Sequence, residues 1–283
     1  MDRHFELTDK FIINAFGAKL FQIKCTRKIK YADIGDLGGY IEKENNLSGD
    51  AWVSGNAQVS GDAQVSGDAQ VSGDARVYGN AQVYGNAWVS GDAWVSGDAQ
   101  VSGDAWVYGN AQVSGDAWVY GNAQVYGDAR VFGNAQVSGD AQVFGDDRVF
   151  GNAWVSGDAW VSGDAQVSGD AWVYGNAQVS GDARVSGDAQ VSGNAQVSGN
   201  AQVSGDARVS NDNEHCGFDC FGSANRHTHS YKTKSGKIEI TCGCFRGSIE
   251  EFEKQIKETH RGNEFERQYI AIVEVIKIKF GLK

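Results

Sequence analysis

Apolar and polar positions recur with a fixed six-residue period from residue 47 to residue 209. Each unit reads Gly-Asp/Asn-Ala-X-Val-Ser/Tyr/Phe, where X is a large polar or aromatic residue. Valines at every sixth position from Val53 to Val209 make 27 units, with no insertion between them. An unbroken period this short is typical of a solenoid.

The spacing within a unit predicts one short strand and one corner. Ala57 and Val59 are two residues apart and share a face of a strand, whereas Gln58 between them faces the other way. Gly55 and Asn56 then turn the chain, because these residue types tolerate positive φ. An antiparallel meander with such turns would leave its Ala/Val face uncovered, whereas coiling buries that face.

The unit resembles the hexapeptide motif of left-handed β-helices, with an aliphatic residue at the first position (Val53) and a small one four later (Ala57). The resemblance implies three units to a triangular coil, and therefore about nine coils. The left hand is implied by the resemblance alone, since ordinary parallel crossovers are right-handed. The expected fold is mainly β: a left-handed parallel β-helix over residues 47–210.

Residues 1–46 are expected to form a small β module that caps the first coil. Residues 21–25 alternate like a half-buried strand and can pair with residues 11–15 across the turn at Phe16 and Gly17. The motif GDLGGYIE at residues 35–42 resembles the N-terminal motif of hexapeptide-repeat proteins often encoded by phages and prophages. Because a solenoid needs its open end covered, capping is the expected role, with binding as the alternative.

Residues 211–283 predict a separate α+β module. A β-hairpin is expected over residues 228–241, around Ser235 and Gly236. Ser248 and the following glutamates form a capping box that opens a helix. Asn263 is a candidate N-cap for a second helix, although residues 274–280 also alternate partly like a strand.

Charge is concentrated in the repeat. The chain has a net charge of −11, and residues 51–209 alone contain 17 Asp and 5 Arg, or −12. An acidic surface disfavours direct binding to nucleic acid or to anionic membranes. Five cysteines, an odd number, and the lack of a secretory signal or transmembrane run favour the reducing cytoplasm of a bacterial host cell.

Outward-facing aromatic residues suggest a binding surface for a protein. Sorted by a three-unit period, the eight tryptophans fall on three faces of the coil: Trp52, Trp88, Trp106 and Trp160; Trp118, Trp154 and Trp172; and Trp94 with Arg76, Arg130, Arg148 and Arg184. Clusters of exposed aromatic rings often mark interaction surfaces. The alternative is that the rings stack along the strands and stiffen the coil.

Asp or Asn occupies nearly every corner of the repeat. One predicted line of corner carboxylates is Asp74, Asp92, Asp128, Asp146, Asp164 and Asp182. Asn at other units dilutes the repulsion between neighbouring carboxylates. Either these side chains only shape the turns, or they form a regular anionic lattice for a cationic partner.

One unit breaks the repeat, because Asp147 stands where every other unit has an inward alanine. A buried, unpaired carboxylate is costly. We therefore expect this coil to deform toward the surface, rather than to hold a functional site.

Four cysteines of the C-terminal module are candidate zinc ligands: Cys216, Cys220, Cys242 and Cys244, with His215, His227, His229 or His260 as alternatives. Their spacings are looser than those of paired C-x2-C knuckles. Structural thiols without a cofactor are the expected interpretation, with zinc as the alternative.

Many left-handed β-helix proteins are acyltransferases that use a histidine base on the helix. All five histidines of this chain lie outside residues 51–209, and no unit carries an inserted loop, so the resemblance implies the fold and not the activity. The expected function is non-enzymatic: a phage-encoded interaction protein that binds or inhibits a host factor, with nucleic-acid mimicry as a candidate mode of binding. The alternative is a structural or assembly protein, able to self-associate, in which the solenoid is a rigid spacer.

Overall fold

The computed structural model describes residues 3–282 and divides into two compact units, 1–157 and 158–283. The chain is mainly β, with about nine coils of parallel β-solenoid in total, small N-terminal strands, and a C-terminal sheet with two helices. The division between the units falls inside the hexapeptide repeat. Each unit is therefore described by itself.

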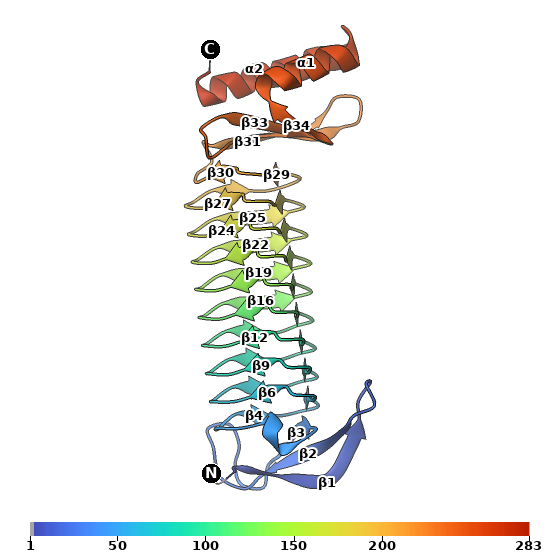
Figure 1. The fold of residues 1–283 in the computed structure, drawn as a ribbon, viewed down its shortest axis with the longest axis vertical. Coiled ribbons are helices and arrows are strands. Elements are labelled where there is room, and N and C mark those ends of the chain that lie inside the picture. Colours follow the sequence, from blue (N-terminus) through green and yellow to red (C-terminus); the bar gives the residue numbers. More distant parts are fainter. Residues whose placement is uncertain (1–2, 283) are drawn as a thin grey trace. The chain divides into compact units, whose positions relative to one another are not determined.

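The coils of the first unit present three parallel sheets, here called faces 1, 2 and 3 (Figure 1). Face 1 comprises β3 (Leu37–Ile41), β5 (Gln58–Val59), β8 (Arg76–Val77), β11 (Trp94–Val95), β14 (Gln112–Val113), β17 (Arg130–Val131) and β20 (Arg148–Val149). Face 2 comprises β4 (Trp52–Val53), β7 (Gln70–Val71), β10 (Trp88–Val89), β13 (Trp106–Val107), β16 (Gln124–Gly127) and β19 (Gln142–Gly145). Face 3 comprises β6 (Gln64–Val65), β9 (Gln82–Val83), β12 (Gln100–Val101), β15 (Trp118–Val119), β18 (Gln136–Val137) and β21 (Trp154–Val155).

Neighbouring coils are joined by backbone hydrogen bonds in strict register. Trp88 N–H donates to the carbonyl oxygen of Ala105 and Ser90 N–H to that of Val107, both at 2.9 Å. Along the repeat, the alanine and valine side chains point inward and are almost completely buried. Both findings confirm the predicted parallel solenoid.

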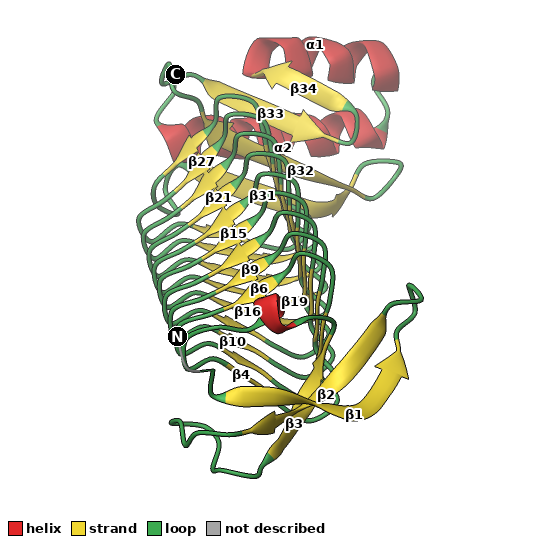
Figure 2. Cartoon of the chain, turned by 60° about the horizontal axis from the view of Figure 1, so that its bottom comes forward, coloured by secondary structure: helices red, strands yellow, loops and turns green. Residues whose placement is uncertain are grey.

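The corners require glycine for two reasons, as Gly91 illustrates. Its φ is 69°, in the left-handed region that other residues rarely adopt. A Cβ atom on Gly91 would also lie 3.0 Å from the backbone nitrogen and oxygen of Gly109 in the next coil. The green corner loops between the yellow strands in Figure 2 follow this turn.

The N-terminal strands extend face 1. β1 (Phe5–Ile13) pairs antiparallel with β2 (Lys19–Cys25), which pairs antiparallel with β3, and β3 pairs in parallel with β5. The predicted hairpin is confirmed, with Phe11 opposite Phe21 and a turn at Gly17, whose φ is 81°.

Several residues close the first coil from below. The His4 ring nitrogen Nε2 donates to the carbonyl oxygen of Ala51 at 2.8 Å. Asn46, in the short 3-10 helix η1 (Glu44–Asn46), is fully buried and its Nδ2 donates to the carbonyl oxygen of Ala63 at 2.8 Å. A Cβ atom on Gly39 would approach the carbonyl oxygen of Ala57 to 2.7 Å. The paired glycines of the GDLGGYIE motif thus let β3 pack tightly against the coil.

The second unit contains further coils of the same kind. Its parallel sheets are formed by β22 (Trp160–Gly163), β25 (Gln178–Gly181) and β28 (Gln196–Val197); by β23 (Gln166–Val167), β26 (Arg184–Val185) and β29 (Gln202–Val203); and by β24 (Trp172–Val173), β27 (Gln190–Val191) and β30 (Arg208–Val209).

A four-stranded antiparallel sheet and two helices complete the second unit. Its elements are β31 (His215–Phe221), β32 (Arg226–Lys232), β33 (Ile238–Cys242), β34 (Phe245–Ser248), α1 (Ile249–His260) and α2 (Glu264–Phe280). The predicted hairpin, the Ser248 capping box and the Asn263 cap are confirmed. Residues 274–280 are helical throughout, so their strand-like alternation does not reflect a strand.

Asp147 points into the interior of its coil. Its side chain is 0% exposed, and Arg130 N–H donates to its backbone oxygen at 2.8 Å, the bond that an alanine carbonyl accepts elsewhere. The expected deformation toward the surface is therefore wrong. The hydrogen bond between coils holds the backbone in register and keeps the side chain inside.

We expect Asp147→Ala to raise the free energy of unfolding by about 1–3 kcal/mol, because alanine does not carry the desolvation cost of a buried carboxylate. Denaturant unfolding measures the change. Asp146→Ala, at the exposed neighbouring position, is the control and should change stability by less than about 0.5 kcal/mol. A loss of stability in Asp147→Ala would show that polar interactions of the carboxylate outweigh its desolvation.

Candidate protein-binding surface

Three aromatic rings stack on the corner of the first unit that follows face 2. Tyr108 and Tyr126 have ring centroids 4.8 Å apart, and Tyr126 and Phe144 4.9 Å, with interplanar angles of 4° in both pairs. The residues are eighteen apart, so each coil adds one ring directly beside the last. We call this stack the aromatic corner.

Two tryptophans continue the apolar surface from the aromatic corner onto face 2. Trp106 meets Tyr108 edge-on with centroids 6.4 Å apart, and Trp88 meets Trp106 edge-on at 5.1 Å. The side chain of Trp106 is 44% exposed, so an apolar surface is available to a partner at the centre of this group.

A line of carboxylates runs beside the aromatic corner, two residues further along each coil. In the first unit this acidic line contains Asp74, Asp92, Asp128 and Asp146, with Asn110 between Asp92 and Asp128, all exposed. Asn110 Nδ2 donates to Asp128 Oδ1 in the next coil at 2.8 Å. Asparagine thus does more than dilute charge, because its amide holds the neighbouring carboxylate in place.

Partial burial of the stacked rings raises the pKa of both Tyr108 and Tyr126. Both hydroxyls therefore stay neutral at physiological pH and keep their protons. Tyr126 donates its proton to Gln142 Oε1 at 3.3 Å. The corner presents apolar rings with polar edges, next to negative charge.

The tryptophans of the first unit are divided among its three faces, and Trp88 and Trp106 lie on face 2. Trp118 and Trp154 lie on face 3, separated by Gln136, and Trp94 lies on face 1 beneath the guanidinium of Arg76, whose Cζ is 5.1 Å from the ring centroid. The second unit contains Trp160, Trp172, Asp164 and Asp182. Asp74 belongs to the acidic line of the first unit.

The sequence analysis missed the aromatic corner. It sorted the outward X positions by three-unit period but did not apply that period to the residues after valine. The eighteen-residue spacing of Tyr108, Tyr126 and Phe144 would have revealed the stack. Conversely, Trp52 is only 5% exposed, because the N-terminal strands cover it next to His4.

The candidate zinc ligands occupy different environments. Cys216 and Cys242 lie on the face of the C-terminal sheet that packs against the helices, and they contact Ser230 Oγ at 3.1 Å and Thr228 Oγ1 at 3.3 Å. Cys220 and Cys244 are exposed. Within residues 3–282, no group of three or more His, Cys, Asp or Glu side chains is arranged to hold a metal ion.

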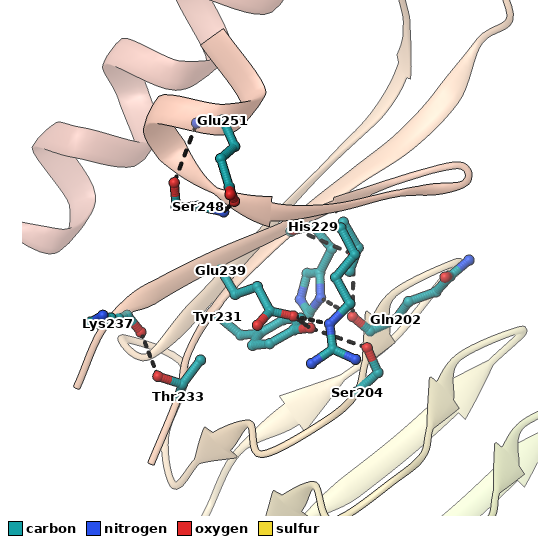
Figure 3. Close-up of polar contacts among 11 residues, drawn as sticks. Gln202, Ser204, His229, Tyr231, Thr233, Lys237, Glu239, Ser248 and Glu251 are labelled. Atoms are coloured by element: carbon teal, nitrogen blue, oxygen red, sulfur yellow. Dashed lines mark hydrogen bonds and ion pairs between the residues drawn. The ribbon is translucent and has the colours of Figure 1, made fainter. Parts of the chain in front are cut away.

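The other face of the C-terminal sheet contacts the coil that contains β29, and Figure 3 shows His229 and Tyr231 directed at Gln202 and Ser204. Tyr231 OH lies 3.1 Å from Ser204 Oγ and donates to Glu239 Oε1 at 2.8 Å. Burial is the main cause that raises the pKa of Tyr231 to about 12.

His229 is held in one neutral tautomer. Its Nδ1 lies 3.0 Å from the carbonyl oxygen of Gln202, which only accepts, so Nδ1 carries the proton. Its Nε2 then accepts from His215 Nδ1 at 3.1 Å. Burial lowers the pKa of His229 to about 3, so these histidines serve the contact with the coil rather than acid–base chemistry on an open surface.

Seven stretches of the chain match the family model of the YdcK β-solenoid repeat: residues 69–81, 81–97, 99–115, 123–139, 165–180, 177–193 and 201–212. They lie in the repeat, except that the last extends to residue 212, and they occur in both units. Together with the coils, they show a β-solenoid repeat protein. No curated protein matches the chain. Within residues 3–282, no helix is both long and apolar enough to span a membrane.

We expect acidification to destabilise the C-terminal module through His229. Its pKa is about 3 when folded and about 6.5 when unfolded, so between these values the unfolded chain binds more protons. Stability is complete above the unfolded pKa and falls as pH drops from about 6.5 toward 3, by about 1–3 kcal/mol between pH 7 and pH 4.

Amide hydrogen exchange in β32 and β33 at several pH values measures this loss. His229→Gln should flatten the pH dependence, because the titrating group is removed. His260→Gln, outside this contact, is the control and should leave the pH dependence unchanged. An unchanged slope in His229→Gln would contradict the assignment.

Proposed function

We propose that this chain is a non-enzymatic interaction protein that binds a basic protein surface through the aromatic corner and the acidic line of its first unit. The observation that carries the proposal is the direct adjacency of stacked, partly exposed rings and exposed carboxylates on one corner. Each half of this surface recognises a different part of a lysine or arginine side chain.

The chemistry of such recognition is already visible within the chain. Arg76 lies over Trp94, and Lys19 Nζ lies 4.0 Å from the ring centroid of Phe11. A cation above an aromatic face gains about 0.5–2 kcal/mol, depending on desolvation. A carboxylate beside the ring adds a charge-assisted hydrogen bond to the same cation.

Pre-organisation favours the aromatic corner as the centre of the interface. Tyr108, Tyr126 and Phe144 are already restrained by stacking, so binding costs little side-chain entropy. Aromatic residues at the centre of an interface often dominate its energy. The acidic line beside them increases the rate of encounter with a cationic partner and defines its orientation.

Nucleic-acid mimicry is the specific form of this proposal. Successive coils place one corner carboxylate or amide about every 4.8 Å, whereas duplex DNA carries one charge per about 1.7 Å. This sparser line of charge attracts a basic groove at low salt more weakly than DNA does. The aromatic corner compensates by supplying apolar contacts that a phosphate backbone lacks. The proposed partner is a basic, nucleic-acid-binding protein in the bacterial cytoplasm, and we propose a phage origin for the chain.

A structural or assembly protein, with the coils as a rigid spacer, is the second candidate. The ordered stacking of rings and the Asn–Asp bonds between coils favour it, because they stiffen a solenoid without any partner. Capture from a nuclease-treated bacterial lysate distinguishes the two. One partner released by high salt supports the binding function, whereas self-association without a partner supports the spacer.

Neutralising the acidic line should weaken binding of the partner. We expect the triple change Asp92→Asn, Asp128→Asn and Asp146→Asn to lower affinity at least about tenfold at low salt and to flatten its salt dependence. The repeat already accepts asparagine at this corner, so folding should be retained. The control is Asp62→Asn, Asp98→Asn and Asp116→Asn, with the same change in charge on another corner. Equal affinities of the two triple variants would contradict the assigned site.

Removing the rings tests the apolar half of the surface. We expect Trp106→Gln with Tyr126→Ser to lower affinity about 10- to 100-fold while leaving the salt dependence unchanged, because packing and not charge is lost. Glutamine and serine occupy these positions in other units. Trp118→Gln, on face 3, is the control. A loss of affinity in Trp118→Gln equal to that in the double variant would place the interface elsewhere.

A further inference from the structure

A cavity of about 430 Å³ lies in the C-terminal module, between the hairpin of β33 and β34 and the helix α1. Its volume falls at the lower end of the range of ordinary small-molecule pockets, about 300–1,000 Å³. All the described residues that line it belong to the second unit. A ligand bound here would therefore serve a function beyond that of the surface proposed for the first unit.

The inner wall of the cavity is made of aromatic side chains that contact one another. Phe245 and Phe252 have ring centroids 4.9 Å apart, and Phe252 meets Tyr269 edge-on at 5.8 Å. His260 stacks on Tyr269 at 5.4 Å, with an interplanar angle of 27°. Phe252 and Tyr269 are buried in the core of the module, so the wall is held in place without a ligand.

One cation in the lining is available to a ligand. Arg226, at the start of β32, lines the cavity and forms no hydrogen bond or ion pair within residues 3–282. A Cβ atom on Gly243, in the turn between β33 and β34, would lie 2.8 Å from its Cδ and 3.0 Å from its Nε, so the glycine gives this side chain room. Burial raises the pKa of Tyr269 to about 12, and the charge of Arg226 opposes this rise. The guanidinium thus lies close enough to the aromatic wall for its charge to act there.

The cavity is cationic although the chain as a whole is acidic. None of the described residues that line it is acidic. Arg246 also lines the cavity, but it pairs with Glu239, and its guanidinium lies next to Gly205 of the adjoining coil. Arg226 therefore carries the unbalanced charge, and an anion is the ligand that would balance it.

Polar groups of α1 in the lining are arranged to donate hydrogen bonds. Gln255 Nε2 donates to Thr259 Oγ1 at 2.9 Å, which leaves the hydroxyl proton of Thr259 available to an acceptor. The C-terminal end of α1 also lies here, and Asn263 N–H donates to the carbonyl oxygen of His260 at 3.1 Å. This bond reduces the negative charge that the end of the helix presents to an anion.

We propose that this cavity binds a small, free aromatic carboxylate. The ring of the ligand packs against Phe245 and Tyr269, with the edge and face contacts that the wall already makes within itself. The carboxylate accepts two parallel hydrogen bonds from Arg226, because it matches the planar fork of a guanidinium and its single charge. A phosphate monoester would bring a second negative charge, which Arg226 alone does not balance.

Calorimetric titration of the full chain with 3-phenylpropionate tests the proposal. We expect a Kd on the order of 0.1–1 mM, because the probe is small. The neutral isostere 3-phenylpropionamide should bind at least about tenfold more weakly, because it cannot form the charged pair with Arg226. No binding of 3-phenylpropionate, or equal affinities for the acid and the amide, would overturn the proposal.

Two further probes define the ligand class. Acetate has the charge without the ring and should not bind measurably. N-acetylphenylalanine carries the amide of a peptide chain and should bind more weakly than 3-phenylpropionate, because the cavity is at the small end of its class. Binding of acetate or of N-acetylphenylalanine as tight as that of 3-phenylpropionate would contradict a free aromatic acid as the ligand.

Substitution of the cation tests the site itself. Arg226→Gln should lower the affinity for 3-phenylpropionate at least about tenfold and leave that for 3-phenylpropionamide unchanged, because only the charged contact is lost. Arg226→Lys keeps the charge without the fork and should lie between. Arg267→Gln is the matched control, since Arg267 is exposed and outside the lining. Equal losses in Arg226→Gln and Arg267→Gln would contradict the site.

Thiol labelling locates the ligand without any substitution. Cys244 lines the cavity and Cys220 does not, and both are exposed. An excess of 3-phenylpropionate should slow the alkylation of Cys244 by iodoacetamide several-fold and leave that of Cys220 unchanged, because only Cys244 is covered. Mass spectrometry of the two peptides measures both rates in one sample. An unchanged rate at Cys244 would exclude binding in this cavity.

Discussion

The backbone hydrogen bonds between coils are the interaction on which the rest of this structure depends. Outward residues donate their N–H to a carbonyl oxygen of the next coil, as Trp88 does to Ala105, seventeen residues ahead. The bonds hold neighbouring strands about 4.8 Å apart, and at that spacing the inward positions of residues 51–209 hold alanine and valine, with Asp147 as the exception. Asp147 follows the same constraint: the register of its backbone keeps the carboxylate buried, although burial is unfavourable for it.

The same spacing between coils creates the aromatic corner and orders the acidic line beside it. Identical positions in consecutive coils lie at about the distance at which flat aromatic rings stack, so Tyr108, Tyr126 and Phe144 form a continuous column. It also brings the amide of Asn110 within hydrogen-bonding distance of Asp128. A repeat that evolves by changing only its outward residues can therefore build ordered binding surfaces without altering its core.

Covering the open ends is the second requirement of such a repeat, because a terminal coil has backbone groups that no further coil pairs with. At the N-terminal end, His4 and Asn46 donate to carbonyl oxygens of the first coils. In the second unit, His229 donates to the carbonyl oxygen of Gln202, and the helices cover the other face of the sheet to which His229 belongs. Both devices satisfy polar backbone atoms, which apolar side chains alone would leave without partners.

The sequence by itself determined the parts of this protein that repeat locally. The six-residue period, the inward Ala/Val pair and the glycine corners predicted the coils, and local capping signals at Ser248 and Asn263 predicted both helices. Tertiary structure alone decided that Asp147 stays inside and that the N-terminal strands cover Trp52. These outcomes depend on which chain segments pack against one another, and a period along the chain carries no information about that. Residues 274–280 show the same limit, because their strand-like alternation belongs to a helix whose buried side is known only from the packing of Ile276.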